Sequence, residues 1–446
     1  MLETGNVLLP GKYRTGTLIS DNPLLNKKQV PIRVTEDGVE VTVAWQEENK
    51  ISSLWYGDES SLNESDRNKI PRNLWFHDAD GSIALLGCRG ASLSQQMLGY
   101  GGGQGTIIAN RAIISAELHS DYQQVYGLRT SIDGLREWIG KSCVMQDPHT
   151  NEAGLLKSET LTIRSPEDIP LNDNPSVSIR FSWIVSNNDD IWEVSDKAYI
   201  ETKSSEPLTW QRAEHLHNAL QDLLRISYGE DRDLTESLVL RSSNTKVSTV
   251  NKVAYEEWLP VIRELRELHK PKRHNCLIPY NLLKKDNIQE WFSLYDRIPR
   301  AIDPLVTSFT LDKVTAEARL FEASIGMEAL GYYLLICNGI SKKAAGNTSF
   351  ENRLELISKS LVDILPYDVD DWIKRTTSAY NGVKHANRKR PDMLTCLNCW
   401  RETTLAFRCW VALKLGIEEE VLKGLASRDS MRNKYELLWD EGKAQE

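Results

Sequence analysis

Alternating hydrophobic and polar positions in the first 205 residues predict short β-strands. Two β-branched runs, at 30–35 and 39–45, flank the turn residues Glu36, Asp37 and Gly38, a pattern typical of a β-hairpin. Residues 176–185 also alternate with a period of two. Short strands separated by turns predict a β-sandwich or an open barrel over residues 1–205.

The hydrophobic period changes to that of an α-helix at about Trp210. Leu216, Leu220, Leu223 and Leu224 share one face of a helix that begins there. Further helices are predicted at 255–269, 288–298, 314–337, 350–364, 369–385 and 393–415. We therefore expect an α+β protein with a β-rich domain at 1–205, a helical connecting region at 206–289 and an all-α helical bundle at 290–446.

Length and charge restrict the class of protein further. A chain of 446 residues is long enough for two or three hydrophobic cores. A net charge of −9 argues against a protein that covers nucleic acid with its whole surface, although a local basic patch is compatible with it. Since the first residues lack a secretory signal pattern and the apolar run at 332–337 is too short to span a bilayer, we expect a cytoplasmic protein without membrane association.

Cysteine and glycine motifs give little support for a cofactor. Seven scattered cysteines predict reduced thiols, and Cys396 and Cys399 lack a second ligand pair for zinc, so they are expected to be core thiols. The glycines at 101–105 lack the Lys-Ser/Thr of a phosphate-binding loop and predict a hairpin tip. No metal ion and no cofactor is expected.

Tryptophans in the N-terminal part leave a third kind of function open. Trp45, Trp55, Trp75 and Trp138 would suit a carbohydrate-binding β-sandwich with a helical dimerisation tail. At strand spacing, however, tryptophan more often fills the core.

The segment 371–390 has the most informative charge pattern. It carries one acidic residue, Asp371, and six basic ones: Lys374, Arg375, Lys384, Arg388, Lys389 and Arg390. On a continuous helix, Asn381 and His385 lie on one face and Arg388 joins them. A histidine that titrates near neutrality, an amide and cations are what RNA cleavage by an attacking 2′-hydroxyl needs, with no metal ion. The alternative is a solvated helix end whose cations favour the helix dipole.

Three segments in the helical region share an order with a known family. Residues 318–330 end in Met-Glu-Ala-Leu, residues 349–357 open a helix after an aromatic residue, and residues 380–385 read Tyr-Asn-Gly-Val-Lys-His. Together, over about 290–415, they resemble the Apea-like branch of the HEPN superfamily, found in bacterial abortive-infection proteins. Residues 8–18 and the hairpin at Asp80 and Gly81 resemble the β-rich N-terminal domain that accompanies such modules.

The resemblance implies a dimeric helical bundle with a composite site that cuts RNA and halts growth on phage infection. His385 matches the histidine of the family signature, Asn381 its polar residue and Glu328 the glutamate of a family helix, interpreted as a polar anchor. The signature arginine is replaced by Tyr380. Arg375, ten residues before His385, is too far along a helix to substitute within one chain. Lys384, Arg388 or the partner chain would have to supply the cation.

The sequence therefore leads to an anti-phage effector with a metal-independent endoribonuclease site as the main hypothesis. The predicted catalytic residues are His385, Asn381 and Lys384, and the predicted RNA contacts are Arg388, Lys389, Arg390, Arg375 and Tyr380. Expected partners are RNA, with tRNA as one candidate, a second copy or a higher oligomer through the bundle, and a phage or accessory defence protein through the β-rich domain. The alternative, which the missing arginine favours, is a non-catalytic scaffold that binds RNA, nucleotide or protein.

Overall fold

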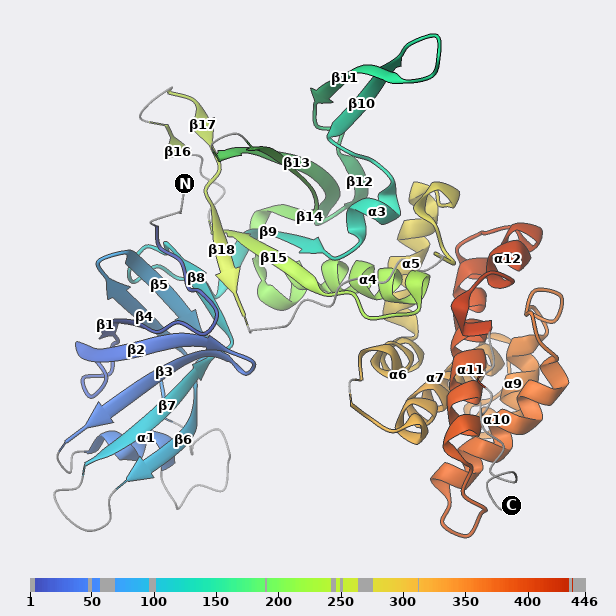
Figure 1. Ribbon diagram of the computed structural model, residues 1–446. Coiled ribbons are helices and arrows are strands. Elements are labelled where there is room, and N and C mark those ends of the chain that lie inside the picture. Colours follow the sequence, from blue (N-terminus) through green and yellow to red (C-terminus); the bar gives the residue numbers. More distant parts are fainter. Residues whose placement is uncertain are drawn as a thin grey trace, which may run out of the picture. The chain divides into compact units, whose positions relative to one another are not determined.

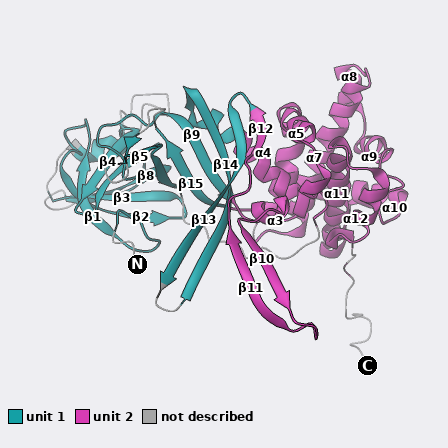
Figure 2. Cartoon of the chain, turned by 90° about the horizontal axis from the view of Figure 1, so that it is seen from above, with its two compact units in different colours: residues 1–131, 173–215, 234–269 teal, residues 132–172, 216–233, 270–446 magenta. Residues whose placement is uncertain are grey.

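A computed structural model gives the fold of the chain. It describes residues 5–46, 50–56, 69–95, 102–188, 191–241, 246–248, 252–263, 276–311, 313–432 and 435. The chain forms two compact units, each assembled from separate stretches (Figure 2). Unit 1 contains residues 1–131, 173–215 and 234–269, and unit 2 contains residues 132–172, 216–233 and 270–446.

Unit 1 is built from antiparallel strands (Figure 1). Its first eight strands are β1 (Arg14–Ile19), β2 (Lys28–Thr35), β3 (Gly38–Trp45), β4 (Asn73–Asp78), β5 (Gly81–Leu86), β6 (Arg89–Gln95), β7 (Gly103–Ala109) and β8 (Arg111–Ile114), with η1 (Lys50–Ser52) and α1 (Ser53–Tyr56) between β3 and β4. The later strands are β9 (Gln124–Ile132), β13 (Ser176–Asn188), β14 (Ile191–Thr209), β15 (Leu234–Leu240), β16 (Lys246–Val247), β17 (Ala254–Tyr255) and β18 (Trp258–Ile262). Hydrogen bonding joins the main sheet in the order β13-β14-β9-β15-β18-β8-β5-β4-β1-β2-β3-β7-β6.

The hairpin expected around Gly38 is confirmed. β2 and β3 pair antiparallel, with Thr35 opposite Gly38. Gly38 has a φ of +127°, which L side chains rarely adopt, and a Cβ there would lie 2.5 Å from the carbonyl oxygen of Ala109. The alternating valines and isoleucines of these strands point into one apolar core with Leu18, Leu74 and Phe76.

The glycines predicted to form a hairpin tip have a different role. Gly103 and Gly105 lie within β7, and a Cβ on Gly105 would come within 2.4 Å of the Trp55 ring. The prediction of a tip is therefore wrong for these residues, because the missing side chains make room for a tryptophan; Gly101 lies outside the described residues.

The tryptophans considered for carbohydrate binding are buried or half-buried. The indole N–H of Trp55 donates to the Thr106 carbonyl oxygen at 3.0 Å, and that of Trp138 donates to the Ile278 carbonyl oxygen at 2.7 Å. Trp45 packs against Trp55, with ring centroids 6.0 Å apart. These side chains pack in the interior, Trp45 and Trp75 from strands and Trp55 and Trp138 from the short helices α1 and α3.

Unit 2 is mainly helical (Figure 1). It contains α3 (Leu135–Ile139), β10 (Val144–Thr150), β11 (Leu156–Ile163), most of β12 (Ile169–Asp173) and the end of α4 (Trp210–Tyr228), which begins in unit 1. Its remaining elements are η2 (Tyr280–Leu282), α5 (Lys285–Arg297), α6 (Pro299–Thr310), α7 (Ala316–Cys337), α8 (Lys342–Asn347), α9 (Phe350–Ser358), α10 (Val369–Lys384), α11 (Met393–Lys414), α12 (Glu419–Ala426) and η3 (Ser430–Arg432).

Helix α7 lies at the centre of the bundle and contacts α6, α9, α10 and α11. Leu320, Met327 and Leu330 on this helix are fully buried. Among the described helices, α7 is the one whose length and apolar composition would suffice to cross a membrane. Contacts with the neighbouring helices bury 39% of its most apolar window.

The predicted α+β class is confirmed, and α5, α7, α10 and α11 lie close to their predicted positions. The helix predicted at 255–269 is wrong where the chain is described, because β17 and β18 occupy residues 254–262; residues 264–269 lie outside the description. Burial along β18 alternates residue by residue around Pro260, which a helix interior would not tolerate. Residues 206–289, expected to be helical, thus contain strands as well as α4.

The cysteine prediction also holds. All seven cysteines are free thiols, and Cys396 and Cys399 are fully buried on α11. Burial raises the pKa of the Cys396 thiol to about 12, so that it remains protonated at neutral pH. The described residues contain no group of three or more His, Cys, Asp or Glu side chains that could hold a metal ion.

Candidate active site at the end of helix α10

Helix α10 presents one face to the bundle and ends at its basic segment. The Asp368 carboxylate accepts a hydrogen bond from the Asp371 N–H at 2.8 Å and caps the start of the helix. Trp372, Thr376 and Tyr380 lie on its buried face. The helix thereby carries the residues after Tyr380 to the surface of unit 2.

His385 lies just beyond the helix, which corrects the expectation of a continuous helical face. The helix ends at Lys384, and His385 has an extended backbone (φ −122°, ψ 117°) while its N–H still donates to the Asn381 carbonyl oxygen at 3.0 Å. The Arg388 N–H donates to the His385 carbonyl oxygen, also at 3.0 Å. This turn, rather than helical spacing, keeps Arg388 close to His385.

Glycine at position 382 allows the chain after the turn to return against α10. A Cβ on Gly382 would lie 2.4 Å from the Lys389 carbonyl oxygen and 2.9 Å from the Pro391 ring. We call residues 385–390 the basic loop. The basic loop therefore packs this closely against α10 because position 382 has no side chain.

The side chains of the basic loop and of Lys384 are exposed. Arg390 forms an ion pair with Glu317 at 2.8 Å. Within the described part of the chain, Arg388 and Lys389 form no ion pair, and their exposed side chains belong to the same short loop as His385. Asn381 is half-buried at the base of the loop.

Tyr380 occupies the position where the family signature has arginine, and it is 2% exposed. Its hydroxyl donates to Glu328 Oε2 at 3.0 Å, and its ring packs against Phe321 and Phe350. Burial, and then the neighbouring Glu328 carboxylate, raise the pKa of Tyr380, so the hydroxyl keeps its proton at neutral pH. The expectation that Tyr380 contacts RNA is thus replaced by a role in packing and in orienting Glu328.

The Glu328 carboxylate connects α7 to two cations. Its Oε2 atom lies 3.7 Å from Lys384 Nζ, and its Oε1 atom lies 3.5 Å from Arg353 Nη1. Lys384 Nζ also lies 5.0 Å from the centre of the Tyr380 ring. Glu328, on α7, therefore contacts α10 through Tyr380 and Lys384. Arg353 was not among the residues predicted from the sequence. The sign that could have indicated it is a charged residue on the helical face that Phe350, Leu354 and Ile357 otherwise make apolar.

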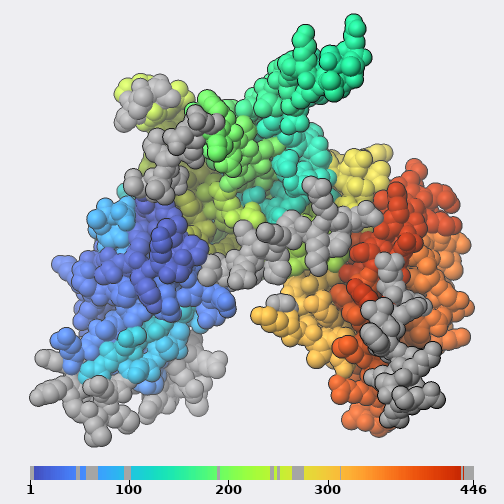
Figure 3. All heavy atoms as spheres, in the orientation of Figure 1, coloured from blue at the N-terminus to red at the C-terminus, as the bar shows by residue number. Residues whose placement is uncertain are grey.

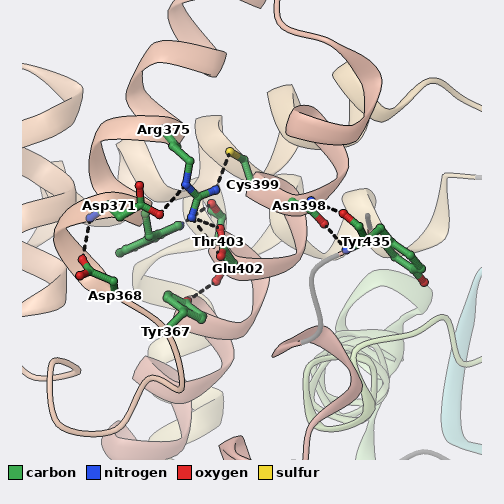
Figure 4. A network of polar contacts seen from close by, with 10 residues as sticks. Tyr367, Asp368, Asp371, Arg375, Asn398, Cys399, Glu402, Thr403 and Tyr435 are labelled. Carbon is green, nitrogen blue, oxygen red and sulfur yellow. Dashed lines mark hydrogen bonds and ion pairs between the residues drawn. The ribbon is translucent and has the colours of Figure 1, made fainter. Parts of the chain in front are cut away.

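Arg375 has protein partners that its charge pattern did not reveal (Figure 4). Its Nε donates to Asp371 Oδ2 at 2.7 Å, and its Nη2 donates to both Glu402 oxygens at 3.1 and 2.9 Å. Glu402 is 1% exposed, so this bidentate contact neutralises a buried charge. The predicted RNA contact at Arg375 is therefore replaced by a structural ion pair.

Two family models match the chain over most of its length. The model of ApeA N-terminal domain 1 matches residues 31–293, and the model of the Apea-like HEPN domain matches residues 336–421. The chain belongs to the ApeA family. No curated protein and no solved structure matches it.

In this ApeA-family protein, the HEPN match covers α10, the basic loop and α11, which contain most of the candidate residues. Glu328 lies just before the matched range and reaches α10 through its side chain. The N-terminal match covers the strands of unit 1 from β2 onward. The HEPN domain makes the protein a defence-associated effector.

Substituting alanine for Gly382 is expected to displace the basic loop while the helices stay folded. The added methyl group would collide with the Lys389 backbone, which cannot move without changing the turn at His385. We expect at least a tenfold loss of any activity that depends on His385, since misplaced groups lose much of their effect. Activity and circular dichroism should be measured together. Gly346→Ala is the matched control, because a Cβ at Gly346 meets nothing within 4 Å; equal activity of the two variants would contradict the prediction.

Proposed function

We propose that this ApeA-family protein is an anti-phage effector of the abortive-infection type that cuts RNA without a metal ion at His385. The observation that supports this is an exposed histidine just beyond the end of α10, in a loop whose exposed Arg388 and Lys389 have no acidic partner among the described residues. A histidine offers a proton donor and acceptor near neutral pH, and Arg388 and Lys389 offer charge to a phosphate.

The proposed reaction is an attack by the ribose 2′-hydroxyl on the adjacent phosphorus. The bond between O2′ and phosphorus forms as the bond to O5′ breaks, which leaves a 2′,3′-cyclic phosphate and a 5′-hydroxyl. One imidazole takes the proton of the 2′-hydroxyl, and a protonated imidazole donates a proton to O5′. Two such groups are supplied if two copies of the chain pair through their bundles, and we therefore propose a dimer or higher oligomer.

Lys384 is the residue we propose in place of the signature arginine. It follows Tyr380 by one helical turn, and its ammonium group lies between the Tyr380 ring and the Glu328 carboxylate. Glu328 restrains this cation at the edge of the basic loop. Asn381, at the base of the loop, is proposed to orient His385.

RNA from a host, with tRNA as one candidate, is the proposed substrate, and the cytoplasm is the proposed location. A phage or accessory defence protein is proposed to bind unit 1. Four large apolar side chains near the ends of β13 and β14 are exposed and support this role: Trp183, Ile184, Ile191 and Trp192.

A second function is favoured by one observation, the buried Tyr380 hydroxyl in place of a cationic side chain. Without that cation, the site would bind RNA, nucleotide or protein as a scaffold and cut nothing. This alternative predicts that the chain binds RNA and does not cleave it.

Purified chain incubated with total RNA and EDTA should separate the two functions. We expect discrete fragments with 2′,3′-cyclic phosphate and 5′-hydroxyl ends, formed equally with and without EDTA. Lys384→Ala should cut at least tenfold more slowly, while Lys374→Ala, an exposed lysine on the same helix, should match the wild type. Absence of fragments, or cleavage that EDTA stops, would reject the proposed reaction.

A further inference from the structure

A cavity of about 660 Å³ lies in unit 2, and Glu328 is one of the residues that line it, whereas Tyr380 and Lys384 are not. The end of α5, the start of α6, the second half of α7, Lys342 and Arg353 line it. Its volume is in the range of sites for small organic molecules. All of its lining residues belong to unit 2.

The cavity has a cationic side. Arg300 and Lys342 are exposed, and neither forms an ion pair within the described residues. Arg353 is buried, and its Nε has no hydrogen-bond partner, while its Nη2 donates to the Ala345 carbonyl oxygen at 3.0 Å. Arg297, a further lining residue, is paired with Glu290. Arg353 is paired with Glu328, and Asp296 adds a carboxylate to the lining, so Arg300 and Lys342 are the cations that favour an anionic group.

The other side of the cavity is aromatic and aliphatic. Tyr332 and Tyr333 are half-buried on α7, one after the other, and Ile325, Ala329 and Ile336 lie on the same helix. Tyrosine rings are surfaces on which bases stack without sequence preference. A base with its phosphate offers a planar ring to the tyrosines and negative charge to Arg300 and Lys342.

The cavity and the basic loop share one carboxylate. Glu328 lines the cavity and pairs with Arg353 there, while its second oxygen contacts the Tyr380 hydroxyl and lies near Lys384. Glu328 is thus a residue that the lining of the cavity and the end of α10 have in common. A base inside the cavity must be unpaired, since a double helix would keep it stacked.

We propose that this cavity binds an unpaired base and its phosphate in the RNA that is cut at His385, so that the substrate class is single-stranded RNA. This inference rests on the proposed function for the cut itself. Tyr332 and Tyr333 stack on the base, and Arg300 and Lys342 bind the phosphate.

Binding measured with the full-length His385→Ala chain tests the cavity independently of cleavage. The probes are a fluorescently labelled 12-nucleotide RNA and the same RNA annealed to its complement. We expect the single strand to bind at least tenfold more tightly than the duplex. Tyr333→Ala and Arg300→Ala should each weaken single-strand binding by about tenfold.

Lys343→Ala is the matched control, because Lys343 is exposed on α8 next to Lys342 and does not line the cavity. It should bind the single strand like the parent chain. Unchanged binding by Tyr333→Ala and Arg300→Ala, or equal binding of duplex and single strand, would overturn the proposal. So would a change of oligomeric state in these two variants by light scattering, since the cavity would then be a subunit contact. Failure of the wild type to cut RNA, with these binding results intact, would reject only the proposed function.

Discussion

Replacing His385 by alanine is expected to abolish RNA cleavage and growth arrest while the chain stays folded. The imidazole is exposed beyond the end of α10, so its removal opens no cavity in the bundle. A positioned proton-transfer group contributes about 10²- to 10⁴-fold to a rate, and a composite site would lose this contribution in both copies. The rate of fragment formation and the growth of an expressing host should be measured side by side.

His149→Ala is the matched control for this experiment. His149 is an exposed histidine on β10, in the same unit but outside the HEPN match. It should behave like the wild type in both assays. Full activity in the His385 variant would remove the nuclease hypothesis at this site, whereas loss of activity together with loss of the folded state would make His385 a structural residue.

Replacing Arg375 by alanine is expected to destabilise the bundle by about 3–5 kcal/mol. Arg375 donates to both oxygens of the Glu402 carboxylate, which is almost fully buried, and removing such a partner from a buried charge is costly. Arg375 also bonds to Asp371 on its own helix. The free energy of unfolding should be measured by urea denaturation with tryptophan fluorescence. The Trp372 indole donates to Thr403, the residue after Glu402, and so lies at a suitable place to report the change.

Lys374→Ala controls for the loss of positive charge on the same helix. Lys374 is exposed and precedes Arg375 in the chain, so its removal should change stability by less than about 0.5 kcal/mol. Arg375→Ala should leave RNA binding by the folded chain unchanged, since the Arg375 guanidinium is occupied by Asp371 and Glu402. A variant Arg375→Ala as stable as Lys374→Ala would show that Glu402 does not depend on this ion pair.

The structure distinguishes two arginines that the charge pattern alone groups together. Arg375 and Arg388 belong to one basic segment of the sequence, but the first neutralises a buried carboxylate and the second faces solvent at the turn after His385. A periodic charge count cannot separate them, because the buried partner of Arg375, Glu402, lies on another helix. Glu402 is 27 residues away along the chain from Arg375.

Local patterns predicted much of the fold. Strand alternation located the β2 and β3 hairpin, and helical periodicity located α5, α7, α10 and α11 within a few residues. The prediction was wrong at β18, where apolar residues on both sides of Pro260 suit either period over so short a run. The glycines in β7 were misjudged because the tryptophans that occupy their side-chain space, Trp45 at Gly103 and Trp55 at Gly105, lie far earlier in the chain.

The sequence by itself determined the α+β class, the family resemblance, and the basic segment that contains His385. These properties follow from the order and spacing of residues, because neighbours along the chain set the local backbone conformation. The tertiary structure decided that His385 lies beyond the helix, that Arg375 is held by Glu402, and that Glu328 links Tyr380 and Lys384 to Arg353 and its cavity. Each of these depends on side chains from different helices meeting in space, and burial then sets which charges stay available to a ligand.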